Sequence, residues 1–445
     1  MATMNNIKIG ALVSVVLLGG ASDVMAGAWS LDSCINYAVS HNLTVKTRNN
    51  DVASARLSVT EAKSQFLPTV DGAVSQNFSF GRGLTAENVY ADRNTSQFQW
   101  GVNANVPLFQ GLSAKRRLDY AKASLRAVLQ EREATKDDVT LNVISAYLQA
   151  LYCAEIEEVA KVQRELSEVE VNRRKELLAA GKIPELDLTE AVSQLAQDEY
   201  TEVNAANDRM LALVDLAQLL ELDPSEPFDI QPLGDGSTER FGVEEVYRNA
   251  MLNNSSILSV KASLDAADRN ISLAKTGYIP KLSFTAGLGS NYYTTHGFPH
   301  DSFGKQMRNN FSTYLGFNLS VPIFDGLSTR NSVNRAKVDR ILAELRLDEA
   351  SNNLYKAINQ AYYKAEAARK RLSACEVARD ATYAAFQAMT EKYNFGRANA
   401  TEFEQSKTAY IKALAEQVQA KYELMLRSRI LGFYNRKAPA LAVIE

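Results

Sequence analysis

One stretch of eleven residues occurs twice in this chain with little change. Asn103-Ala-Asn-Val-Pro-Leu-Phe-Gln-Gly-Leu-Ser113 reappears, at an offset of 215, as Asn318-Leu-Ser-Val-Pro-Ile-Phe-Asp-Gly-Leu-Ser328, and seven of the eleven positions are identical. Upstream the offset is 212, so that Asn42 matches Asn254. Similarity at a fixed offset over this distance indicates two tandem copies of one structural unit.

The repeat predicts how the chain is divided. The two copies cover residues 27–222 and 243–435, and a tail follows at 436–445. The bridge at 223–242 is rich in Pro and Gly, which is typical of a linker. Each copy has the same turn motif after its second predicted strand. It consists of Pro107, Phe109 and Gly111 in the first copy and of Pro322, Phe324 and Gly326 in the second.

The N-terminal segment 1–26 has the pattern of a secretory signal peptide. Lys8 precedes an apolar run from Ile9 to Gly20, and small residues around Ala26 suit cleavage. A transmembrane anchor would need about 20 apolar residues. The run is shorter, so we predict a cleaved signal over 1–26 and an exported protein.

Two very long helices are predicted, one in each copy. Gly and Pro are absent from 112–180 and from 327–395, two stretches of equal length. A helix of that length spans about 100 Å. Apolar residues recur in steps of three and four, as in coiled coils. Returning helices are predicted at 185–222 and 401–434, and single helices at 31–66 and 243–278 have the length needed to stack on them.

Four segments alternate between apolar and small polar residues. They are predicted as strands at about 69–82, 95–107, 281–293 and 310–322. Alternation gives each strand one apolar face, and the other faces carry mainly Asn, Gln, Ser and Gly. The lengths match tilted membrane strands, and the polar faces resemble those of barrel lumens. The alternative is the half-buried sheet of a soluble sandwich, which should carry more charge.

Four strands cannot close a barrel, and an open edge in hydrocarbon leaves backbone groups unpaired at several kcal/mol each. We therefore predict closure by oligomerisation. A dimer would supply eight strands and a filled interior, whereas a trimer would supply twelve and begin to leave a lumen. The fold class is mainly α with a small membrane β-barrel contribution, and the trimer would combine a 12-strand β-barrel with a 12-helix α-barrel.

Composition excludes several classes of function. The 49 basic and 52 acidic residues leave a net charge of −3, which gives no reason to expect nucleic acid as a partner. The three cysteines lie far apart and only three histidines occur. We expect no catalytic centre, no metal site and no cofactor, and therefore no enzyme.

These residues together resemble the TolC family of bacterial outer-membrane channels. The resemblance rests on the doubled Val106–Gly111 and Val321–Gly326, the doubled rod, and two tip turns. The second tip, Tyr393-Asn-Phe-Gly-Arg397 followed by Thr401-Glu-Phe403, is similar to the family's signature at this place. The resemblance implies a homotrimer in the outer-membrane lipid that extends into the periplasm. It also implies a periplasmic adaptor and an inner-membrane pump of the RND or ABC type as partners, so that the chain is the exit duct of a tripartite efflux or type I secretion system.

The tips supply the candidate functional residues. If three subunits converge there, Asp187 and Glu402 place six carboxylates around the periplasmic mouth, where they would attract cations. The simpler interpretation is that an acid in the first helical turn suits the helix dipole. Tyr393 and Arg397 are candidates for a latch between helix pairs. Adaptor docking is expected at the tips, on Gly181, Lys182, Leu186, Leu188, Gly396 and Phe403.

Two other functions remain open at this point. One is a trimeric structural protein, such as an adhesin-like surface coiled coil, which long helices alone would allow. The other is a periplasmic adaptor, which shares the helical hairpin but would lack the four membrane strands.

Overall fold

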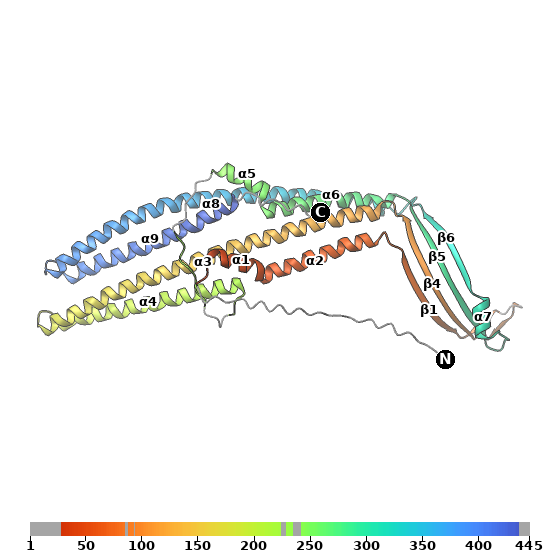
Figure 1. Cartoon of the computed structure of the whole chain (residues 1–445), viewed down its shortest axis with the longest axis horizontal. Coiled ribbons are helices and arrows are strands. Elements are labelled where there is room, and N and C mark those ends of the chain that lie inside the picture. The colour runs from red at the N-terminus through yellow and green to blue at the C-terminus, as the bar shows by residue number, and fades with distance from the viewer. Residues whose placement is uncertain (1–27, 85–87, 93, 224–227, 235–241, 436–445) are drawn as a thin grey trace, which may run out of the picture.

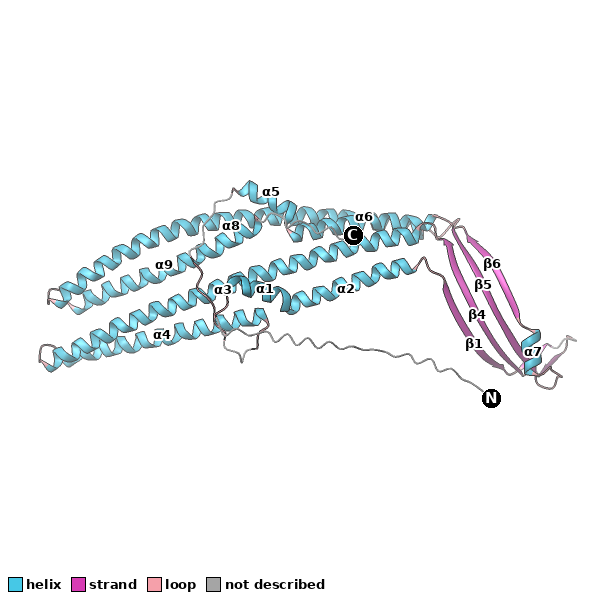
Figure 2. Ribbon diagram, viewed as in Figure 1, coloured by secondary structure: helices cyan, strands magenta, loops and turns pink. Residues whose placement is uncertain are grey.

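The computed structural model describes residues 28–84, 88–92, 94–223, 228–234 and 242–435. The predicted signal peptide, the tail and part of the linker therefore lie outside the described residues. The described chain is a long rod of helices that ends in a curved sheet (Figures 1 and 2). The two sequence copies run side by side along the rod, and the predicted fold class is confirmed.

The first copy contains helices α1 (Leu31–His41), α2 (Leu43–Ser64), α3 (Ser113–Ala179) and α4 (Glu185–Leu220) and strands β1 (Thr69–Ser79) and β4 (Thr95–Phe109). A small hairpin, β2 (Arg82–Leu84) and β3 (Tyr90–Asp92), lies between the two strands. The second copy contains α5 (Val243–Asn253), α6 (Ser255–Ala274), the short 3-10 helix η1 (Lys275–Tyr278), β5 (Lys281–Thr295), α7 (Phe303–Asn309), β6 (Ser312–Ser320), α8 (Ser328–Asn394) and α9 (Ala400–Tyr434).

The single helices predicted at 31–66 and 243–278 are each two helices. The breaks fall at Asn42 and Asn254, which are equivalent positions in the two copies. Asn42 Oδ1 accepts a hydrogen bond from the Thr44 amide at 2.9 Å, and Asn254 Oδ1 accepts one from the Ser256 amide at 3.1 Å. These bonds cap a new helix and compete with continuation of the old one, so the chain turns at each Asn.

The core of the rod lies near its middle, where α1, α3 and α4 meet. Cys34, Val143, Tyr147 and Leu216 are almost completely buried there. The Tyr147 hydroxyl lies 3.0 Å from the carbonyl oxygen of Trp29 and 2.6 Å from that of Gln231, and so holds the linker against the helices. Among the described helices, only α3 contains a stretch that is long and apolar enough to cross a membrane, and 44% of that apolar stretch is buried in the protomer. Since α3 is a core helix of the rod, we do not assign it to the membrane.

The main sheet has the order β1-β4-β5-β6, and every pair is antiparallel. Its register repeats with the sequence: Val74 pairs with Trp100, and the equivalent residues Ala286 and Leu315 also pair. Strands β1 and β6 are therefore edges, with a neighbour on one side only. The offset between the two copies rises from 212 to 215 because the second copy has three extra residues. These lie in the β5–β6 connection, which contains α7.

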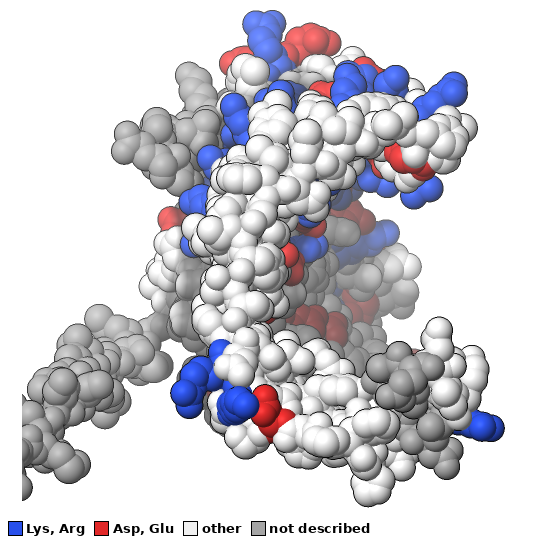
Figure 3. Space-filling model, turned by 90° about the vertical axis from the view of Figure 1, so that its right-hand side faces the viewer, with Lys and Arg blue, Asp and Glu red and all other residues white. Residues whose placement is uncertain are grey.

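The register separates an apolar face from a polar face, as predicted. Strongly exposed residues on the apolar face include Val70, Val74, Phe78, Leu315, Phe317 and Leu319. On the polar face, the Tyr314 hydroxyl donates to Asn103 Oδ1 at 3.0 Å. Viewed from this end, Lys, Arg, Asp and Glu lie mainly at the margins of the sheet (Figure 3). Exposure of this many large apolar residues needs a covering apolar phase.

Helix α7 was not predicted and covers part of the apolar face. Ser290 Oγ donates to the Met307 carbonyl oxygen at 2.7 Å, and the Phe303 ring lies 5.7 Å from that of Phe98 and 5.1 Å from that of Tyr292. Seven residues are too few for a helical period to stand out in the sequence.

The repeated turn motif joins the sheet to the long helices. Gly111 (φ +60°) and Leu112 (φ +65°) are both left-handed, as are Gly326 and Leu327 in the second copy. A Cβ at Gly111 would also lie 2.9 Å from Ile279 Cβ, so a side chain there would clash. The motif therefore serves as the corner between strand and rod.

Candidate functional site at the helical tips

Both long helices end before a left-handed Gly. α3 ends at Ala179, and Gly181 (φ +64°) turns the chain before α4 begins at Glu185. α8 ends at Asn394, and Gly396 (φ +68°) does the same before α9. Side chains are strained at such φ values, so Gly suits both positions. The hairpins α3–α4 and α8–α9 have their turns at the same end of the rod, away from the sheet (Figure 1).

Four side chains connect the two hairpins near these turns. We call this cluster the tip latch; it consists of Glu170, Arg173 and Arg174 of α3 and Tyr393 of α8. The Tyr393 hydroxyl donates to Glu170 Oε1 at 2.5 Å, and Arg174 Nε donates to the same oxygen at 2.7 Å. Arg173 lies over the Tyr393 ring at 4.0 Å from its centroid and donates to the Tyr393 carbonyl oxygen at 3.0 Å.

The centre of the latch is shielded from water. Glu170 and Arg174 are 4% and 5% exposed, so their ion pair is a buried, hydrogen-bonded one. Burial, reinforced by the Glu170 carboxylate, raises the pKa of Tyr393 and keeps its hydroxyl a donor. Burial acts to lower the pKa of Arg174, but its contacts with Glu170 and Tyr393 outweigh this effect, and the pKa is raised.

Aromatic packing holds Tyr393 in place. The Phe403 ring stacks on the Tyr393 ring at 4.7 Å between centroids and lies 5.8 Å from Phe386. Phe403 is only 6% exposed. Its side chain therefore supports the latch, and its predicted role in adaptor docking stays a prediction.

A second polar network lies farther from the tip and is more deeply buried. Lys407 of α9 is 1% exposed, and its Nζ donates to Ser167 Oγ of α3 at 2.8 Å. Ser167 Oγ in turn donates to Asp198 of α4, which is also 1% exposed. Gln163 and Gln194 donate to Asp198 Oδ1 at 2.6 and 2.9 Å. We call this the Lys407 network; like the tip latch, it joins the two hairpins.

Lys407 Nζ lies 3.8 Å from Asp198 Oδ2 and 2.8 Å from Oε2 of the less buried Glu404. Removing Lys407 alone should destabilise the protein more than removing Lys407 together with Asp198. Lys407→Val leaves Asp198 without its cation, and loss of one partner of a buried pair costs about 3–5 kcal/mol. The equivalent positions in the other copy are Val192 and Ala413, so both sites tolerate apolar residues. We expect Lys407→Val to lower the unfolding temperature in detergent, followed by circular dichroism, and Asp198→Ala to restore most of it. An additive loss in the double variant would contradict the coupling.

The predicted tip residues occupy different environments. Glu402 forms a capping box: its amide donates to Asn399 Oδ1 at 2.8 Å, and its Oε2 accepts from the Asn399 amide at 3.0 Å. Asp187 holds the same position in the first turn of α4, and its carbonyl oxygen accepts from Arg174 Nη1 at 2.6 Å. Arg397 is exposed and takes no part in the tip latch. Gly181, Lys182, Leu186 and Gly396 are exposed, and Leu188 is half-buried.

The sequence reasoning missed Glu170, Arg174, Asp198 and Lys407. The sequence does contain a sign that Glu170 and Arg174 are buried, because they follow Leu166 in steps of four on the apolar side of α3. Charges at such seam positions indicate a buried polar contact. Their partners could not be found in this way, since Tyr393 is far from Glu170 along the chain.

Long paired hairpins, an open four-stranded sheet with one apolar face and a latched tip define a membrane-anchored helical channel protein. The pattern of the family described as outer membrane efflux protein matches residues 34–221 and 246–431. This chain belongs to that family.

Known proteins agree with this placement. The outer membrane protein TolC of Escherichia coli K12 is 23% identical over 381 residues, which are 83% of this chain and 74% of that protein. The structure of CusC has a TM-score of 0.77 at 15% identity and covers 91% of each chain. The Campylobacter jejuni CmeC outer membrane channel has a TM-score of 0.73 at 18% identity, over 91% of this chain and 85% of that one.

The family settles the class of function. The chain is an outer-membrane exit duct of an efflux or type I secretion system and extends into the periplasm. It acts as a trimer with a periplasmic adaptor and an inner-membrane pump. The family and the four strands together decide against the surface stalk and the adaptor that the sequence left open.

Proposed function

We propose that the duct opens and closes at its helical tips, and that the tip latch keeps it closed. The observation that carries this is the hydrogen bond from Tyr393 to Glu170, which ties the α8–α9 hairpin to the α3–α4 hairpin. A channel that widens at this end must move one hairpin relative to the other. We further propose that the duct is passive, with no catalytic activity of its own.

Adaptor docking at the tips is the second part of the proposal. A groove of 630 Å³ lies between α3 and α8 beside the latch, and its lining includes Val169, Arg173 and Asn394. An adaptor segment that enters this groove would touch Arg173, which lies over Tyr393. Docking and release of the latch would then be one event.

Breaking the turns tests whether the tips take part in export. Gly181→Pro and Gly396→Pro impose a negative φ, whereas both turns need a positive one. We expect each variant to form trimers in the outer membrane but to lose export in cells that lack the wild-type gene. The control is Glu349→Ala, a substitution at an exposed position of α8. Wild-type export by both Pro variants would remove the tips from the mechanism.

Cation selectivity tests the role of the tip carboxylates. Asp187→Asn with Glu402→Gln removes up to six charges from the mouth of a trimer, and the introduced Gln amide oxygen can still accept the capping hydrogen bond. We expect the reversal potential in a salt gradient across a planar bilayer to move towards zero. Asp348→Asn, on α8 far from the tip, should leave it unchanged. An unchanged potential in the double variant would assign both acids to helix capping only.

A further inference from the structure

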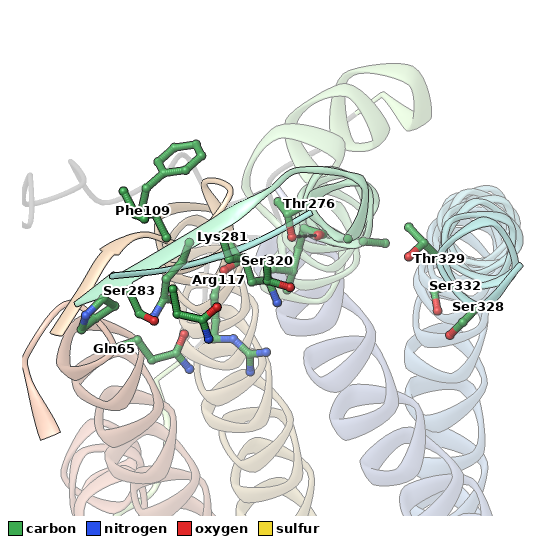
Figure 4. A pocket seen from close by; sticks show the side chains of 18 of the residues that line it. Gln65, Phe109, Arg117, Thr276, Lys281, Ser283, Ser320, Ser328, Thr329 and Ser332 are labelled. Carbon is green, nitrogen blue, oxygen red and sulfur yellow. Dashed lines mark hydrogen bonds between the residues drawn. The ribbon is translucent and has the colours of Figure 1, made fainter. Parts of the chain in front are cut away.

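A cavity of 660 Å³ lies where the sheet meets the rod. Its walls come mainly from the polar face of the sheet, from the first turns of α3 and α8, and from the end of α6 with η1. Figure 4 shows Gln65 and Arg117 below the strands, the hydroxyls of Ser328, Thr329 and Ser332 on the opposite side, and Phe109 pointing out of the cavity. The polar face is the lumen side of this family's barrel, so the cavity opens into the duct.

The charges in the cavity are of one sign. Arg117 and Lys281 both line it, and among the described lining residues none is Asp or Glu. Within the described chain neither cation forms an ion pair. The rest of the lining is dominated by hydroxyl and amide groups, including Ser283 and Asn318. Two unpaired cations beside neutral hydrogen-bonding groups suit an anion.

The internal repeat shows that the fold does not require these two cations. The position equivalent to Arg117 in the second copy is Ser332, at an offset of 215. The position equivalent to Lys281 in the first copy is Thr69, at an offset of 212. Each copy thus has one cation and one neutral residue at these two positions, so neither position needs a cation for the corner to form. The positive charge is an addition to the corner rather than part of its construction.

We propose that this cavity is an anion-binding station in the wall of the duct, which holds carboxylate or phosphate groups of passing solutes. The proposal rests on the assignment of the chain as an exit duct. In a trimer the station occurs three times and places six cations at the level where the helical barrel meets the strand barrel. Anionic solutes would concentrate there and pass on by exchange.

Block of single-channel current by inorganic tripolyphosphate tests the station. The variant Arg117→Ser with Lys281→Thr places the residues of each equivalent position in the other copy. We expect it to form trimers and conduct, while the half-blocking tripolyphosphate concentration rises about tenfold, because two nearby attractive charges are lost. Lys115→Ser removes a charge from the same turn of α3 but outside the cavity. Its half-blocking tripolyphosphate concentration should equal that of the parent.

The outcomes separate the station from the duct. An equal half-blocking concentration in parent and double variant, or an equal rise in Lys115→Ser, would overturn the station while the duct stands. A parent that conducts but is not blocked by tripolyphosphate would also overturn it. A parent trimer that does not conduct at all would contradict the duct itself.

Discussion

Tyr393→Phe is expected to raise the single-channel conductance of the trimer at least about threefold. The substitution keeps the ring that Arg173 and Phe403 contact but deletes the hydrogen bond to Glu170. A hydrogen bond to a charged group contributes about 1.5–3 kcal/mol, and the trimer has three. Together these give about 4.5–9 kcal/mol, a range that includes the roughly 5.5 kcal/mol that moves a two-state equilibrium from 1:99 to 99:1. Planar-bilayer recording measures the change.

Tyr383→Phe is the matched control for the latch. Tyr383 lies on the same helix and contacts the Tyr410 ring at 5.1 Å, within its own hairpin. The single-channel conductance of the Tyr383→Phe trimer should equal that of the wild type. If Tyr393→Phe also conducts like the wild type, the bond to Glu170 does not hold the tip closed. Glu170→Ala should additionally lower thermal stability, because it leaves Arg174 buried without its anion.

Leu315→Arg is expected to abolish insertion into the outer membrane. Leu315 is 76% exposed on the apolar face of the edge strand β6. Arg on a lipid-facing strand costs about 2–4 kcal/mol at the centre of the bilayer, and three copies bear this cost at once. Membrane fractionation and heat-modifiability of the trimer on gels measure the loss.

Asn318→Arg on the same strand gives the control. Asn318 belongs to the polar face, so its replacement adds the same charge towards the lumen. We expect this variant to insert and assemble. If both Arg variants insert equally well, the apolar face of the sheet does not meet lipid, and the assignment of the two faces is wrong.

The large elements of this fold are predictable for simple reasons. Uninterrupted stretches without Gly or Pro leave a helix as the natural structure, and α3 and α8 each begin and end within one residue of those limits. Strict alternation likewise predicts the two faces of the sheet. The breaks at Asn42 and Asn254 were missed because Asn occurs in helices as well as in caps, and only the capping bonds decide.

The site is less predictable than the fold. The tip turns could be found from Gly181 and Gly396, and Tyr393 from its resemblance to a family signature. The role of Glu402 in a capping box follows from Asn399 three residues earlier. The tip latch itself depends on how two distant hairpins lie against one another, and no local pattern in the sequence contains that information.

The sheet also predicts how neighbouring copies join. Within the protomer, Asn103 of β4 pairs with Gly287 of β5. Applying the repeat offsets of 215 and 212 to this pair places Asn318 of one copy opposite Ser75 of the next.

Cysteine cross-linking at this seam measures the closure of the sheet directly. Ser75→Cys with Asn318→Cys, in a chain whose partly exposed Cys375 is replaced by Ser, places two Cys on facing edges. Paired residues lie about 5 Å apart and diagonal ones about 7–8 Å, whereas disulfides need Cα atoms about 4.4–6.8 Å apart. Asn77→Cys with Asn318→Cys is the diagonal control. On oxidation in native membranes the first variant should become a covalent trimer, and the control should not. Cross-linking that stops at dimers, or a folded chain that never cross-links, would contradict a duct closed by three copies.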